Sequence, residues 1–372
     1  MSKILIAGDF CPNGRVTKLL ERRDYDKVLS DVRKVTSSVD YSIVNFECAV
    51  VTGQETSIQK AGPNLSCDET GIDSLEWAGF NCLTLANNHF YDFGDKGVEN
   101  TIAACHYHHL DYMGGGMNIK EASSIFYKAI KNQRFAFINC CEHEFSIATD
   151  HFGGSNPLNP ITQYYAIREA KEKADFVIVI VHGGLEHLQV PSVRMKELYH
   201  FFIDVGADVI IKHHQHCFCG MEKYRDRFIF YGLGNFCFDW EGKRHSMWNE
   251  GYMVKLDFNE TIQYEIVPYK QCDNTPCVSL TGIDTESFEK RFRVLSEVIL
   301  DNNQLKEKNT AFAMENIQRY KMIFEPYSGK IGFGLYFRNL LPSFVSKNVK
   351  TKINFIECEA HREALIEVLK SL

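Results

Sequence analysis

The stretch that most constrains the fold is residues 206–216, where a run with a β-branched core, residues 208–211, is followed by three histidines. The run is short and rich in β-branched residues, which is typical of a buried β-strand. Side chains alternate between faces along an extended backbone, so His214 and His216 are expected to point the same way. Imidazole is the commonest metal ligand near neutral pH, and two on one face make half a site. An incidental surface cluster is the alternative, since 14 of the 372 residues are histidine.

The composition is that of an ordinary globular protein. Hydrophobic residues make up 45% and charged residues 24% of the chain, which excludes a disordered protein. The formal net charge of −7 gives no overall basic surface, so we expect no nucleic-acid partner. The 13 cysteines contain no CxxC pair and favour a reducing compartment. With no apolar run long enough for a signal peptide or a membrane span, we expect a cytoplasmic protein.

Short apolar runs alternate with helical periodicity along most of the chain. The expected strands cover residues 4–7, 41–46, 81–86, 135–141, 175–181, 208–211 and 227–233, and the expected helices cover 25–37, 95–106, 161–173 and 193–205. This alternation predicts a layered α/β domain, whose active site lies beyond the carboxyl ends of the strands. Strand-like pieces at 253–258 and 261–268 precede helical patterns at 285–300, 309–324 and 361–372. We therefore predict a first domain of residues 1–282 and a helical appendage of residues 283–372.

Five of the expected strands end in residues of the metal-binding kind. They are Asp9, Glu47, the Asn87-Asn88-His89 run, His182, and the His214 and His216 pair. Each has a simple alternative when taken alone, such as a helix cap, a solvated strand end or a turn. Buried charges are costly unless they are paired or bound to metal. The recurrence of carboxylate, amide and imidazole groups at equivalent strand ends therefore predicts a cation site.

The order of these motifs resembles a known family. The motifs are Gly8-Asp9, Asn45-Phe46-Glu47, the segment 87–94, His182-Gly183-Gly184-Leu185-Glu186, His214-Gln215-His216 and the segment 231–236. Over roughly residues 1–270 they resemble the CapA family of bacterial capsule and poly-γ-glutamate synthesis proteins, which belongs to the calcineurin-like metallophosphoesterase superfamily. The resemblance implies an α/β fold of four αββα layers, with a two-metal centre between the edges of the two sheets.

The resemblance also implies a role for each residue. The metal ligands would be Asp9, Glu47 as the bridging carboxylate, Asn88, His182, His214 and His216, holding one or two divalent ions of Mn, Fe, Zn or Mg. Cys11 stands where the superfamily has a histidine. As a thiolate it would bind Zn or Fe, and the alternative is a buried thiol before a turn. Glu47 replaces the superfamily's aspartate, as in CapA relatives.

The expected chemistry is hydrolysis of a phosphoester or a related bond. Two neighbouring cations hold a hydroxide and clamp phosphoryl oxygens. His89 would then act as general acid, with Asp92 holding its tautomer. Candidate substrate-binding residues are Arg15, Glu186 and Asn235, for which the alternatives are a surface arginine, a solvated loop residue and a tight turn under the site.

The sequence therefore predicts a divalent-metal-dependent hydrolase of a small or polymer-linked anionic substrate, associated with capsule or exopolymer biosynthesis. One alternative is a non-catalytic accessory or scaffold protein of polymer assembly. Another is a metal-dependent amide hydrolase acting on a poly-γ-glutamate-like substrate. The sequence gives no expectation for the substrate's identity or for the oligomeric state.

Overall fold

Two stacked β-sheets form the centre of the larger, N-terminal unit. The computed structural model describes residues 1–327 and 329–370, which form two compact units, Met1–Lys306 and Glu307–Leu372. In the first unit, one sheet has the strand order β18 (Val278–Ser279), β17 (Ile262–Gln271), β16 (Glu250–Phe258), β1 (Ser2–Phe10), β2 (Tyr41–Phe46), β5 (Cys82–Thr84) and β6 (Asp111–Met113), with β15 (Asn235–Cys237) also pairing with β1. The other sheet has the order β13 (Met221–Tyr224), β14 (Arg227–Phe230), β12 (Val209–His213), β11 (Phe176–His182), β9 (Gln133–Cys141) and β8 (Phe126–Ile130).

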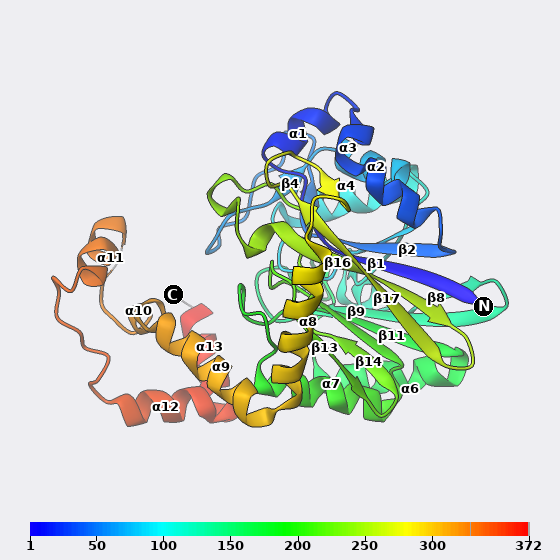
Figure 1. Ribbon diagram of the computed structural model, residues 1–372. Helices are drawn as coiled ribbons and strands as arrows, with labels where there is room; N and C mark the ends of the chain where they lie inside the picture. Colours follow the sequence, from blue (N-terminus) through cyan, green and yellow to red (C-terminus); the bar gives the residue numbers. More distant parts are fainter. Residues whose placement is uncertain (328, 371–372) are drawn as a thin grey trace. The chain divides into compact units, whose positions relative to one another are not determined.

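Helices cover the outer sides of both sheets (Figure 1). The helices α1 (Arg15–Leu20), α2 (Tyr25–Thr36), α3 (Thr70–Trp77) and α4 (Gly94–Tyr107) lie along the first sheet, at the top of the view. The helices α6 (Pro160–Lys173) and α7 (Val193–Val205) lie along the second sheet, at the bottom. The predicted α/β fold of four αββα layers is confirmed.

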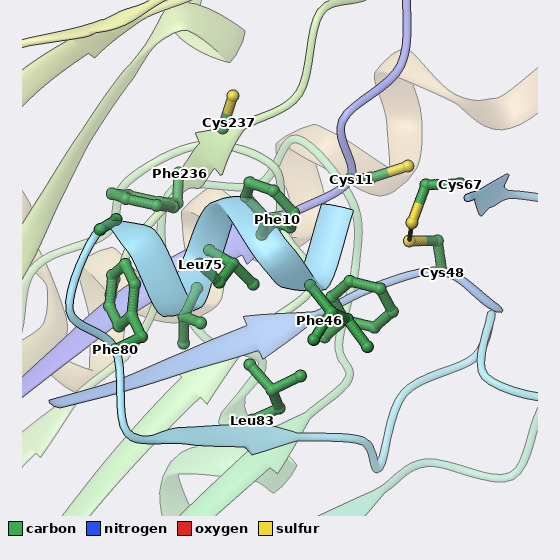
Figure 2. Close-up of a cluster of buried hydrophobic side chains, with 14 of the residues drawn as sticks. Phe10, Cys11, Phe46, Cys48, Cys67, Leu75, Phe80, Leu83, Phe236 and Cys237 are labelled. Atoms are coloured by element: carbon green, nitrogen blue, oxygen red, sulfur yellow. Dashed lines mark hydrogen bonds between the residues drawn. The ribbon is translucent and has the colours of Figure 1, made fainter. Parts of the chain in front are cut away.

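Two apolar layers hold this arrangement together. Between the sheets, Ile4, Ile43, Ile180 and Ile211 are fully buried in one cluster. Between the first sheet and its helices lies the cluster in Figure 2, where the Phe10 and Phe46 rings stack with centroids 6.1 Å apart. Burying each such side chain contributes about 1.5–3 kcal/mol.

The alternation of side chains along β2 directs polar groups to the inner side of the first sheet. Val44 and Phe46 belong to the helix-side cluster, whereas Ile43 belongs to the layer between the sheets. Asn45 and Glu47 share the side of Ile43 because successive residues of a strand point to opposite faces. The aromatic side chain of Phe46 thus anchors the strand end while its polar neighbours face the second sheet.

A β-bulge near the end of β1 redirects Asp9. Leu5 and Ala7 belong to the helix-side cluster, so unbroken alternation would place Asp9 on that side as well. The register with β2 shifts between Ala7 and Asp9, and Phe10 instead takes the helix-side position. Gly8 permits this path, because a Cβ there would lie 1.9 Å from the carbonyl oxygen of Gly234. The bulge therefore turns Asp9 toward the inner side of the sheet.

The C-terminal region is helical, as predicted, but the first compact unit reaches further than residue 282. Helix α8 (Thr285–Leu300) belongs to the first unit, and its Phe288 is fully buried with its ring centroid 4.4 Å from that of Phe218. Asn316 separates α9 (Asn302–Glu315) from α10 (Ile317–Met322), where one helix over 309–324 was expected. The remaining helices are α11 (Gly329–Phe337), α12 (Val349–Glu357) and α13 (Glu359–Lys370). Among the residues that the structure describes, no helix has the length and apolar character needed to cross a membrane.

Candidate metal centre

Polar side chains from both sheets meet at the carboxyl ends of β1, β2, β11 and β12. They form two groups of potential metal donors, and in each group the donor atoms all lie within 4.8 Å of one another. One group consists of Glu47, His182 and His214, and the other of Asp9, Glu47 and His216. Glu47 is common to both groups, so one carboxylate lies between two sets of ligands. One carboxylate shared in this way would suit two neighbouring cations.

Glu47 is the residue whose environment most clearly fits a cation. It is fully buried, and neither of its carboxylate oxygens has a hydrogen-bond partner. Burial, followed by the charge of Asp9, raises the pKa of Glu47 well above its usual value. Oε1 lies 3.6 Å from Nε2 of His182 and 3.8 Å from Nε2 of His216. An unpaired carboxylate in such a place is costly, and a divalent ion would compensate its charge.

In the first group, the side chains of Asn88 and His214 both approach Nε2 of His182. This nitrogen lies 3.0 Å from Oδ1 of Asn88 and 3.0 Å from Nδ1 of His214. The amide of Asn88 is held in place because its Nδ2 donates to Oε2 of Glu144 at 3.0 Å, which leaves the oxygen directed at the site. These nitrogen and oxygen donors suit Mn, Fe or Zn, and Mg is favoured less because it prefers oxygen ligands.

In the second group, neighbouring side chains orient both Asp9 and His216. Asp9 accepts a hydrogen bond from Nδ2 of Asn45 at 2.8 Å, and its Oδ1 lies 3.1 Å from Nδ1 of His213. Burial opposes ionisation of Asp9, but the hydrogen bond and charge of His213 lower its pKa overall. Nδ1 of His216 lies 2.9 Å from Oδ1 of Asn235. Donation by Nδ1–H to this amide oxygen would leave Nε2 free to bind a metal.

The conformation of the histidine segment differs from the sequence prediction. Strand β12 ends at His213, and His214 and His216 have φ angles of 96° and 57°. The backbone is therefore not extended here, as the prediction assumed, although the two imidazole rings still lie near each other, with centroids 5.9 Å apart. The turn after His213 places the two side chains in different donor groups.

His89 and Asp92 form a buried pair beside the two donor groups. Nδ1 of His89 lies 2.7 Å from Oδ2 of Asp92, within hydrogen-bonding distance. Burial lowers the pKa of His89 below its usual value, and Asp92 opposes this shift. Lys60, which the sequence analysis did not select, forms an ion pair with Asp92 and places Nζ 3.1 Å from Nδ1 of His89.

Glu144 was also absent from the sequence prediction, although a signal for it existed. It comes shortly after the end of β9, as the selected residues follow other strands. Lys60 lies in an irregular segment, and no motif marks it.

Cys11 lies on the helix side of the first sheet, in the apolar cluster of Figure 2. Its sulfur is turned toward Cys48 and Cys67, whose Sγ atoms are 3.6 Å apart. Neither of the two donor groups includes Cys11. This position favours a buried thiol over a metal ligand.

The two charged residues considered for substrate contacts differ in their surroundings. The guanidinium of Arg15 makes hydrogen bonds of 2.9 Å to both carboxylate oxygens of Asp239 and also donates to the backbone carbonyls of residues 272–274. These contacts account for Arg15 without a substrate. Glu186 is half-buried in the loop after β11, and its charge contributes to the raised pKa values of Glu47 and Glu144. A contact between Glu186 and a substrate stays a prediction.

We expect the metal-free protein to lose stability in acid because of His214. Burial, followed by the charge of His216, lowers the pKa of His214 from 6.5 to about 3. Below pH 6.5 the unfolded chain takes up a proton there and the folded protein does not, so stability falls until the pH reaches about 3. Between pH 6 and 4.5, wild type should lose about 2 kcal/mol more than His214→Gln in urea unfolding with chelator. A difference between the two proteins that is constant with pH would contradict this expectation.

Comparison with known proteins identifies the family to which the chain belongs. The family described as "Bacterial capsule synthesis protein PGA_cap" matches residues 3–240, a range that includes every residue of the two donor groups. The capsule biosynthesis protein CapA of Bacillus anthracis is 33% identical over 287 residues, covering 75% of this chain and 70% of that protein. The PGA biosynthesis protein CapA of Bacillus subtilis (strain 168) is 28% identical over 302 residues, covering 80% and 77%. A solved structure of a phosphatase from Mycoplasma pneumoniae aligns with a TM-score of 0.46 at 14% identity, covering 77% of this chain and 99% of that one.

Proposed function

The chain belongs to the PGA_cap family of bacterial capsule synthesis proteins, and from this premise we propose that it is a divalent-metal-dependent hydrolase. Its substrate would be a phosphoester or a related anionic compound of capsule or exopolymer metabolism. The observation that carries the proposal is Glu47, a fully buried carboxylate without a hydrogen-bond partner between two sets of imidazole and oxygen donors.

The residues divide into two tasks. Asp9, Glu47, Asn88, His182, His214 and His216 would hold one or two ions of Mn, Fe, Zn or Mg. Such ions, when bound, supply Lewis acidity and a nucleophilic hydroxide. Asn45, Glu144 and Asn235 keep these ligands in position through the hydrogen bonds described above.

His89 would transfer a proton to the leaving oxygen. A general acid needs a fixed ring and a partner that stabilises its protonated form. Asp92 meets both needs, since it is fully buried and its Oδ2 lies 2.7 Å from Nδ1 of the imidazole. The other ring nitrogen, Nε2, would then face the substrate.

The two other functions make different demands on the site. An accessory protein of polymer assembly needs no proton donor, so the buried His89–Asp92 pair favours an enzyme. Amide hydrolysis would use the same metal centre, and its support is the name of the Bacillus subtilis relative, a PGA biosynthesis protein. We place phosphoester hydrolysis first because the donor groups share one bridging carboxylate, as in two-metal displacement at phosphorus.

The test combines elemental analysis with an activity screen. The purified protein is assayed with Mn, Fe, Zn and Mg on phosphomonoesters, phosphodiesters and γ-glutamyl amides, beside His214→Ala as the matched site variant. Metal-dependent release of phosphate that His214→Ala abolishes supports the proposal. Cleavage of the amides alone would establish the amide hydrolase, and bound metal without any hydrolysis would favour the accessory role.

A further inference from the structure

Lys60 is a buried cation that no motif of the chain explains. Its side chain is 1% exposed, although it lies in the irregular segment 51–65 between β3 (Ala49–Val50) and β4 (Ser66–Cys67). Lysine is almost never fully buried without a partner. Here the partner is the carboxylate of Asp92, which is itself fully buried.

Asp92 joins this segment to His89. Its Oδ1 pairs with the Lys60 ammonium, while its Oδ2 accepts the backbone N–H of Leu65 at 2.7 Å and lies 2.7 Å from Nδ1 of His89. The backbone carbonyl of Asp92 accepts the N–H of Ile58 at 2.9 Å. The segment 51–65 therefore contacts the same residue that orients the imidazole.

The Lys60 ammonium also contacts the imidazole itself and the backbone next to it. Nζ is 3.1 Å from Nδ1 of His89 and 3.5 Å from the backbone carbonyl of Asn88, which Lys60 contacts as a donor. Because its side chain is 1% exposed, Lys60 is shielded from a substrate in the site. Any effect on catalysis must therefore pass through the groups that Lys60 contacts, which are Asp92, His89 and the backbone of Asn88.

From this geometry we infer that Lys60 is a positioning residue, which fixes the Asp92 carboxylate and through it the orientation of the His89 ring. The inference rests on the proposed function for its catalytic consequence. The ion pair holds Oδ1 of Asp92, so that Oδ2 faces the imidazole in a single geometry. Without the ammonium, the carboxylate keeps the hydrogen bond from the backbone N–H of Leu65 but loses its second anchor, so the direction of the ring is less narrowly fixed.

The kinetic test is a double-mutant cycle with Lys60→Met and His89→Ala. Lys60→Met alone should lower kcat about 10-fold for a substrate with a poor leaving group, with metal content and KM unchanged. In the His89→Ala background it should cause no further loss, because the residue through which it acts is gone. Lys96→Met is the matched control, since Lys96 forms an exposed ion pair with Glu99 and should leave kcat unchanged. An equal loss in both backgrounds would overturn the inference.

A second measurement does not depend on activity. In the zinc-loaded full-length protein, the Nδ1–H of His89 bound to a carboxylate should give a downfield proton resonance, identified by its absence in His89→Ala. Lys60→Met should shift or broaden this resonance, and Lys96→Met should not. Breaking a buried ion pair is destabilising, so Lys60→Met alone could fold poorly. The double variant Lys60→Met/Asp92→Asn removes both charges and leaves neither one unpaired. It should also lose the resonance. If the resonance is the same in Lys60→Met as in wild type, the positioning role is refuted. If Lys60→Met shifts the resonance but wild type hydrolyses no substrate, only the proposed function is refuted.

Discussion

Replacing Glu47 with glutamine is expected to remove most of the bound metal from both positions. The carboxylate belongs to both donor groups, is fully buried and has no hydrogen-bond partner, so a bound cation would be the main group that compensates its charge. The neutral amide keeps the size of the side chain but removes the charge that attracts the ion. Metal content by elemental analysis should fall from up to two ions per chain to well below one, and hydrolysis should become undetectable.

The same substitution should stabilise the metal-free protein. Burial raises the pKa of Glu47 in the folded protein, whereas in the unfolded chain the group is a free carboxylate at neutral pH. Folding must therefore either bury the charge or add a proton, and both cost free energy. Glutamine removes this cost, and the melting temperature in chelator should rise. His214→Ala is the comparison, because it removes a ligand of one group only and should spare more of the metal. Full metal content in Glu47→Gln would exclude Glu47 as the bridge.

The layers of the fold were predictable because local patterns determine them. The expected helix at 193–205 is α7, with Ser192 as its N-cap and Gly206, at φ 137°, at its end. Strand β2 covers the expected residues 41–46, and its alternation alone places Glu47 on the inner side of the sheet. Where the hydrophobic periodicity and the signals at the ends of an element predict the same boundaries, tertiary contacts change the element little.

The finer parts of the site depend on contacts between distant segments and so were missed. The bulge that turns Asp9 inward needs the close approach of Gly8 to Gly234, which no local pattern contains. Strand β12 continues to His213, two residues past the expected end at residue 211, and the turn at His214 that follows it has no local sequence signal. Lys60 reaches His89 from 29 residues away in sequence through an irregular segment, where no periodicity predicts the direction of a side chain.

Replacing His89 with alanine is expected to lower turnover by roughly 10²–10⁴-fold, the usual contribution of a general acid, while metal content stays near that of wild type. His89 belongs to neither donor group, and its Nδ1 is occupied by Asp92, so its loss removes a proton donor and not a ligand. Asn88→Ala, one residue earlier, should instead reduce metal occupancy, because the amide oxygen lies 3.0 Å from Nε2 of His182.

The leaving group of the substrate distinguishes a general acid from a structural histidine. A leaving group with a low pKa departs without a proton, so the loss in His89→Ala should shrink to a few-fold for nitrophenyl esters and stay large for alkyl esters. His108→Ala is the matched control, since His108 is equally buried and pairs with Glu76 outside the site, and its effect should not depend on the leaving group. Equal losses for both kinds of ester, or loss of metal with His89→Ala, would reassign His89 to a ligand or a structural support.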